Sequence, residues 1–239
     1  MKCRVCIFLI IISLKCLDAD ILKFDKKLKV RRWRISTTFG FIGEGVSREF
    51  EEKMNYYGFN EISPKVLFWG PTSHPFTADR VSLDFTISFT INKNYSLALY
   101  FFYSQFRTSG YHKLPTEIYF DINYKVRIFS LLYIVGPLKF IQFGIGPGVA
   151  KLKMTTDKIL NYHYVETKIR PSIVIQTSIY VPYKTRFFIK ITGNSGVLLN
   201  EKFGPIIAYK YYDFSEGILT PVKVNPSFFY FGIGFGFFF

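Results

Sequence analysis

Charged residues recur at every second position in several segments, a spacing that places them on one face of a β-strand. Lys125 and Arg127 form one such pair, and Lys168 and Arg170 form another. Because charges enclosed in a narrow interior are stable only when they are paired, we expect these cations to share an interior with nearby acids. The predicted interior charge network comprises Arg34, Asp84, Glu117, Asp121, Lys125, Arg127, Glu166, Lys168, Arg170, Arg186 and Lys190.

Two roles are open for this network. In the first, ion pairs fill the interior and hold its walls together. In the second, they gate a narrow path, and Arg127 or Lys168 exchanges partners among Asp84, Asp121 and Glu166. We predict the structural role, because a narrow interior is filled by its own side chains.

Catalytic and metal-binding patterns are weak by comparison. His74, His112 and His163 lie in different predicted loops, and none has a second metal ligand at close spacing. Ser73 beside His74 does not make a nucleophile pair. The glycine-rich stretch 144–148 lacks the lysine and the following helix of a phosphate-binding loop. We therefore expect no enzyme, no metal site and no cofactor.

The elements that carry these residues are β-strands. Eight segments alternate between large apolar residues and small or polar ones with a period of two. The last is the clearest, because its odd positions from Phe229 to Phe239 are large and apolar while positions 232, 234 and 236 are glycine. In a helix, each interior glycine would cost about 1 kcal/mol. The segments are 33–41, 81–92, 95–105, 116–134, 140–150, 164–181, 186–194 and 228–239.

The fourth segment is the least regular of the eight. We place its even-numbered residues, such as Tyr124 and Val126, on the apolar face, and Lys125 and Arg127 on the polar face. Residues 129–135 are apolar on both faces, so we expect a bulge or a change of register there.

The connections between segments alternate in length. The short ones are 93–94, 136–139 and 182–185. Even-numbered antiparallel membrane barrels show this alternation, with long loops outside the cell and short turns in the periplasm. We therefore predict an all-β fold, an eight-stranded antiparallel transmembrane β-barrel over residues 33–239. The long connections are 42–80, 106–115, 151–163 and 195–226.

The apolar face could point inward, as in a soluble lipocalin-like barrel, or outward into lipid. Three features favour the outward direction. The polar face is rich in glycine and small residues, it carries charges of both signs, and the apolar face ends in aromatic residues suited to a membrane interface. These aromatic residues are Trp33, Tyr95, Tyr103 and Phe239. No apolar run reaches the roughly 18 residues, free of charge, proline and glycine, that a spanning helix needs.

The N-terminal segment 1–19 has the pattern of a secretory signal. Lys2 and Arg4 precede the short apolar stretch 5–14, and Ala19 provides a small residue at a cleavage site. The predicted domain organisation is a signal peptide at 1–19, a basic periplasmic leader at 20–32 and the barrel at 33–239.

All three cysteines of the chain fall inside the predicted signal peptide, so the predicted mature chain has no thiol chemistry. Lys15 argues against lipid modification of Cys16. Cleavage removes three bases and one acid and lowers the formal net charge from +14 to +12. Behind an export signal, this basic charge predicts lipid and lipopolysaccharide phosphates as partners, and no nucleic acid.

With this pattern the chain resembles the small eight-stranded barrels of bacterial outer membranes, of the OmpA transmembrane-domain and OmpX kind. The resemblance covers 33–239 as a pattern, and its one specific motif is the last strand with its terminal phenylalanine. In that family such a strand is recognised by the barrel-assembly machinery. The resemblance therefore implies this role for Phe231, Ile233, Phe235, Phe237 and Phe239. No peptidoglycan-binding domain is expected after the barrel, so a wall-anchoring role has no support.

The sequence thus predicts a monomeric integral outer-membrane barrel that acts through its surface loops, in adhesion, surface interaction or envelope integrity. One alternative is a narrow channel or transporter for a small or hydrophobic solute. Pro147 and Pro171 could mark a lateral opening for it, since each removes a ladder donor. A lipid-modifying enzyme is a further alternative. In the first long loop, 47–58 has the capping pattern of a short helix over the barrel mouth, or of a ligand-binding lid.

Overall fold

The computed structural model describes residues 32–44, 60–61, 81–92, 94–112, 118–136, 140–159, 162–183, 186–210 and 213–239. The predicted signal peptide, the leader up to residue 31, the predicted helix at 47–58 and His74 lie outside these residues. Within the described part of the chain, no helix has both the length and the apolar character needed to cross a bilayer.

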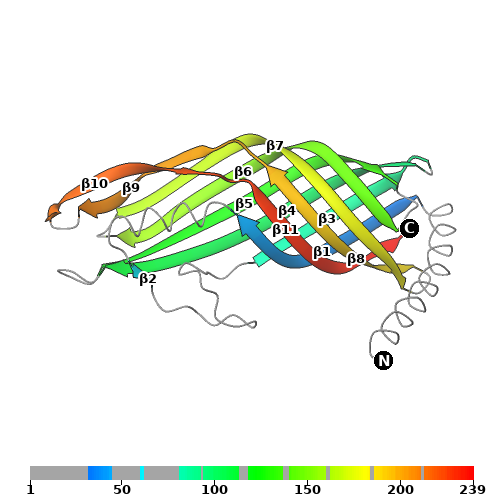
Figure 1. Ribbon diagram of the computed structural model, residues 1–239, viewed down its shortest axis with the longest axis horizontal. Coiled ribbons are helices and arrows are strands. Elements are labelled where there is room, and N and C mark those ends of the chain that lie inside the picture. Colours follow the sequence, from blue (N-terminus) through cyan, green and yellow to red (C-terminus); the bar gives the residue numbers. More distant parts are fainter. Residues whose placement is uncertain are drawn as a thin grey trace, which may run out of the picture.

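Eight strands form a closed antiparallel barrel (Figure 1). Each strand pairs with the next one along the wall, and the last strand pairs with both β8 and β1, which closes the ring. The two-residue strand β2 (Asn60–Glu61) adds to the edge of β4. The barrel strands are β1 (Trp33–Glu44), β3 (Val81–Thr90), β4 (Tyr95–His112), β5 (Ile118–Val135), β6 (Ile141–Ile159), β7 (Tyr162–Tyr183), β8 (Phe187–Val197) and β11 (Phe228–Phe238).

The eight predicted strands are confirmed, but several run further than predicted. β4 and β5 continue until only 113–117 separate them, and β6 and β7 until only 160–161 separate them. The long loops predicted at 106–115 and 151–163 are therefore wrong. Ladder pairing persists there because the outward residues can be polar once the strands extend beyond the apolar part of the wall.

The connection predicted at 195–226 also contains regular structure. It holds a separate two-stranded sheet of β9 (Glu201–Lys210) and β10 (Asp213–Val224). Figure 1 places this hairpin at the end of the barrel away from the C-terminus, beside the extended ends of β6 and β7.

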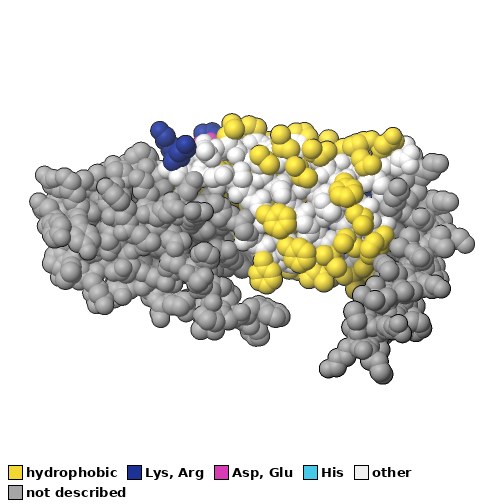
Figure 2. Space-filling view, in the orientation of Figure 1, with side chains coloured by type: hydrophobic (Ala, Val, Ile, Leu, Met, Phe, Trp, Pro, Cys, Tyr) yellow, Lys and Arg dark blue, Asp and Glu magenta, His cyan; other side chains and the backbone are white. Residues whose placement is uncertain are grey.

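Large apolar side chains are exposed on the outer face of every barrel strand. On the face seen in Figure 2 they are spread over the part of the barrel toward the end with the C-terminus. One from each strand is between 37% and 57% exposed, in wall order Phe39, Phe85, Leu99, Leu131, Ile145, Ile175, Ile189 and Ile233. We name these residues, together with the other exposed apolar residues on the outer faces of the same strands, the apolar belt. The predicted outward direction of the apolar face is confirmed for this part of the wall.

Closure between β1 and β11 depends on glycine. A Cβ atom at Gly234 would lie 2.0 Å from the carbonyl oxygen of Thr37, so only glycine allows this close approach. At the end of the same ladder, the Phe239 N–H donates to the carbonyl oxygen of Trp33 at 3.0 Å. In the turn after β5, Gly136 adopts a left-handed backbone conformation with φ 74°.

The interior of the barrel is filled by side chains, as expected for eight strands. The ring of Phe102 stacks on that of Phe228 with centroids 4.5 Å apart, and Tyr230 meets it edge-on at 5.2 Å. The largest fully buried side chains are Arg34, Tyr100, Phe102, Tyr124, Phe188, Lys190 and Tyr230.

The inner wall has two chemically different sectors. β1, β3 and β8 contribute mostly hydroxyl, amide and charged groups. Apart from Ser130 and Gln142, the buried side chains of β5 and β6 are apolar or aromatic, and these are Tyr124, Val126, Ile128, Leu132, Ile134, Ala150, Leu152 and Met154. The predicted polar lining is therefore correct for only part of the interior.

Candidate functional site

A buried ion pair lies at the centre of the polar sector. The Lys190 Nζ atom is 3.5 Å from Asp84 Oδ1, and both side chains are fully buried. The same ammonium donates to Thr86 Oγ1 at 3.1 Å. Asn194 Nδ2 donates to Asp84 Oδ2 at 2.9 Å and to the Tyr100 hydroxyl at 3.0 Å. These bonds connect β8 to β3 and β4 through the interior.

Nearer the C-terminal end, Arg34 forms a second cross-barrel contact. Its guanidinium donates to Gln142 Oε1 at 3.0 Å and to Ser96 Oγ at 3.3 Å, so it joins β1 to β6 and β4. The guanidinium also lies 5.3 Å from the centre of the Tyr180 ring. Arg34 thus lies in the interior of the barrel, on the side of the wall that the sequence predicted.

At the opposite end, the β9–β10 hairpin contacts the inner face of β7. Lys168 Nζ lies 3.2 Å from Glu166 Oε1 and 3.6 Å from Glu201 Oε2. Arg170 donates to Glu201 through two nitrogens, with Nη2 to Oε2 at 3.0 Å. Phe203, fully buried, meets Tyr124 edge-on with centroids 6.0 Å apart. The hairpin therefore covers the apolar sector at this end.

The structure divides the predicted charge network. Arg34, Asp84 and Lys190 lie inside the barrel, and Glu166, Lys168 and Arg170 meet at its mouth. Asp121 lies in β5 opposite Ser109 and Asp157, and Glu117 lies outside the described residues.

Three of the predicted interior residues are misplaced. Lys125 and Arg127 point to the outer face of β5, and Arg186 is exposed in the turn before β8. No bulge or register change occurs at 129–135, since the pairing of β4 with β5 is continuous. Toward its N-terminal end the strand continues past the apolar belt, where Lys125 and Arg127 lie on the outer face and Tyr124, on the inner face, packs against Phe203 of the hairpin.

The gating hypothesis has no support as a result, because the residues that it invoked do not share one interior site. Arg127 is on the wrong side of the wall to exchange interior partners. Lys168 contacts Glu166 and Glu201, whereas the partner of Asp84 is Lys190. Glu201 was missed because it falls in a segment taken for a loop. The spacing of Glu201 and Phe203, two residues apart, indicates that both lie on one face of a strand. It does not indicate which barrel strand that face contacts.

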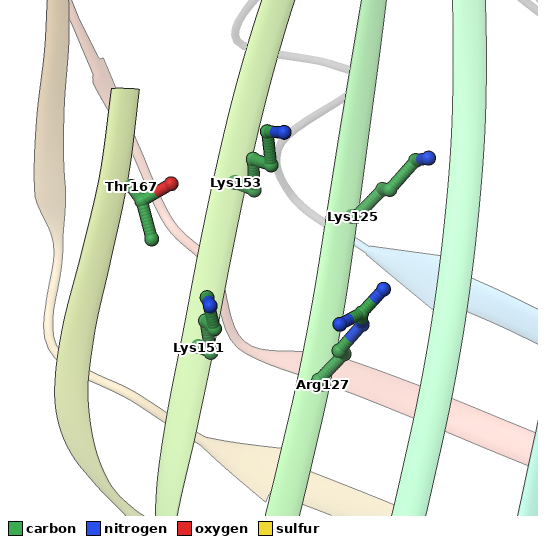
Figure 3. A pocket seen from close by; sticks show the side chains of 5 residues that line it. All are labelled: Lys125, Arg127, Lys151, Lys153 and Thr167. Carbon is green, nitrogen blue, oxygen red and sulfur yellow. The ribbon is translucent and has the colours of Figure 1, made fainter. Parts of the chain in front are cut away.

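The misplaced cations form a cluster on the outer wall. Lys125 lies directly opposite Lys153, and Arg127 directly opposite Lys151, on the paired strands β5 and β6. With Thr167 of β7 they line a hollow of about 190 Å³, and Figure 3 shows their side chains on neighbouring strands. We name Lys125, Arg127, Lys151 and Lys153 the basic cluster.

The residues of the predicted assembly signal form the outer face of β11. Phe231, Ile233, Phe235 and Phe239 are exposed, and Phe237 is half-buried against Phe187 and Phe239. The role in assembly stays a prediction. Among the described residues, no group of three histidine, cysteine or acidic side chains could hold a metal ion; His112 lies in β4 and His163 in β7.

Comparison with known proteins gives no family. No protein-family model matches the sequence, and no curated protein matches it. Similar solved structures include the outer membrane protein AlkL, with 15% identity over 87% of this chain and 90% of that one and a TM-score of 0.46. OprG of Pseudomonas aeruginosa, also an outer membrane protein, has 13% identity over 87% of this chain and 96% of that one, with a TM-score of 0.48.

Ail, the attachment invasion locus protein of Yersinia pestis, solved with a heparin analogue, has 11% identity over 86% of this chain and 97% of that one and a TM-score of 0.39. Identity and TM-score are low in all three cases. The function of this chain therefore has to be argued from its own residues.

Proposed function

We propose that this chain is an integral β-barrel of a bacterial outer membrane, closed to free diffusion, that acts through the end of the barrel away from its C-terminus. One observation carries the proposal: a ring of exposed apolar side chains surrounds a barrel whose own interior is already filled. Soluble monomers rarely expose a continuous apolar patch of more than a few hundred Å². In a bilayer the same surface is solvated by lipid.

The closed interior favours a role in surface interaction, adhesion or envelope integrity over bulk transport. Arg34, the Asp84–Lys190 pair and the rings around Phe102 occupy successive levels of the barrel. A permeant ion would have to displace buried, hydrogen-bonded groups. We propose no catalytic activity, a monomeric state, and insertion by the barrel-assembly machinery through β11.

Conductance of the purified protein in planar bilayers tests the closed state. We expect no discrete openings from the wild-type chain. The double variant Phe102→Ala/Tyr230→Ala, which removes two interior rings in edge-on contact, is the positive control and should show openings. Discrete wild-type openings would contradict the closed state. A wild-type protein that stayed folded and monomeric in buffer without detergent would overturn the membrane assignment itself.

A second candidate function, passage of a small hydrophobic solute through the wall, has one specific observation in its favour. The β5–β6 ladder pairs Ser130 with Gly148 and Tyr133 with Ile145, but the two pairs between them are missing from it. Pro147 lies at this interruption and has no N–H to donate, although the strands stay in contact there, since the Ser130 hydroxyl donates to the Pro147 carbonyl oxygen at 2.8 Å. If the strands separate here to admit solute, Pro147→Val should abolish uptake of a hydrophobic dye into proteoliposomes. Equal uptake with and without protein would remove this candidate.

A further inference from the structure

The basic cluster is arranged in two rows across the wall. In each row, every residue lies directly opposite the next one on the neighbouring strand. The row nearer the apolar belt is Tyr103, Arg127, Lys151 and Ile169, and the row further from it is Gln105, Lys125, Lys153 and Thr167. Side chains directly opposite on antiparallel strands lie about 5 Å apart, and like charges in such pairs destabilise a sheet. Two such cationic pairs are stacked here.

Within the part of the chain that the structure describes, no carboxylate pairs with any cation of the cluster. The contact that these cations do make is aromatic: the Arg127 guanidinium lies 5.8 Å from the centre of the Tyr103 ring. By contrast, Lys168 and Arg170 at the barrel mouth and Lys190 inside the barrel all pair with acids. The cluster is therefore an excess of positive charge that an external anion would neutralise.

The position of the cluster indicates what kind of anion that is. On each of these strands, the next outward-facing residue toward the apolar belt is apolar and exposed. These four residues form a row of Phe101, Phe129, Val149 and Pro171. Two residues along a strand span about 7 Å. A ligand held by the cluster would thus have its charge just above the apolar belt and its apolar body against it.

We propose that the basic cluster is a binding site for the phosphate groups of a phosphorylated glycolipid in the outer leaflet of the membrane. Guanidinium and ammonium groups form short, charge-assisted hydrogen bonds with phosphate oxygens. The cluster is at the barrel end that carries the long connections between β1 and β3 and between β8 and β11, and in barrels of this type that end faces the outer leaflet. This inference rests on the proposed membrane location and names a lipid class for it.

The test uses the purified protein folded in neutral detergent micelles, at low and at physiological salt. Three probes are titrated: diphosphorylated lipid A, the same lipid with its phosphates removed, and inorganic phosphate alone. Bound lipid is counted by native mass spectrometry, and the unfolding temperature gives a second measure. The variant is Arg127→Gln/Lys151→Gln.

The matched control is Lys202→Gln/Lys223→Gln. These two exposed lysines also lie directly opposite each other, on β9 and β10, and their removal changes the net charge equally. We expect the diphosphorylated lipid to bind the wild type and the control alike, and the cluster variant about 10- to 100-fold more weakly. Binding should weaken as salt rises. Because all four substituted positions are exposed, both double variants should fold as the wild type does, which circular dichroism checks.

Three results would overturn the inference. The phosphate-free lipid could bind as tightly as the phosphorylated one, the control could lose as much affinity as the cluster variant, or inorganic phosphate could bind as tightly as the lipid, which would make this a free-anion site. None of these concerns whether the protein needs detergent to stay dispersed. A failed lipid site and a failed membrane assignment are therefore separate outcomes.

Discussion

Lys190 and Lys151 carry the same ammonium group on opposite sides of one barrel wall. Lys190 is fully buried and has an acid and a hydroxyl as partners. Lys151 is exposed and lies opposite another cation, Arg127. The difference shows that a charge inside this fold is held by fixed polar partners, an acid for Lys190 and neutral amide and hydroxyl groups for Arg34. On the exposed outer face, Lys151 has no such partner among the described residues.

The strongest way to break this comparison is to remove the interior partner. Asp84→Ala leaves the Lys190 ammonium without its acid and the Asn194 amide without one of its two acceptors. We expect a loss of about 3–5 kcal/mol in the free energy of unfolding. Urea unfolding in micelles measures it.

Lys151→Ala is the matched change outside the wall and should stay within about 0.5 kcal/mol of wild type. The double variant Asp84→Leu/Lys190→Met, which removes both interior charges, should recover most of the lost stability. Similar losses for Asp84→Ala and Lys151→Ala would contradict the inside–outside distinction.

A second prediction compares two outward positions on β6. Ile145 lies in the apolar belt and Lys151 in the basic cluster. Ile145→Arg should cost about 2–4 kcal/mol in a bilayer, because the new charge enters hydrocarbon. Lys151→Ile, the reverse exchange above the belt, should cost little. Refolding in lipid vesicles measures both, and a harmless Ile145→Arg would mean that this face is not in lipid.

The eight strands could be predicted because the two-residue period survives wherever one face must meet lipid. The outward direction predicted for the side chains of Trp33, Phe143 and Phe231 is correct. The period alone does not say which face is inside. For Lys125 and Arg127 we took charge as the sign of the interior, and this fails where a strand continues above the belt.

The apolar interior was unpredictable for a related reason. Tyr124 and Val126 are apolar because Phe203 and the rings of β11 pack against their sector, not because they face lipid. Phe203 and Glu201 fall within a segment without a regular pattern, so no local signal connects them to β5 or β7. Contacts across the interior depend on which strands meet, and that follows from closure of the barrel.

The smallest predicted effect concerns how Arg127 is held outside the wall. Its guanidinium lies 5.8 Å from the centre of the Tyr103 ring, and the Tyr103 hydroxyl donates to Gln105 Oε1 at 2.6 Å. Tyr103→Leu should cost about 0.5–1 kcal/mol more than Tyr103→Phe, because only phenylalanine keeps the ring for the cation. In an Arg127→Gln background this difference should vanish, since the cation is gone. If it persists, the ring acts by packing alone, and the outer cation is held neither by an acid, as Lys190 is, nor by an aromatic face.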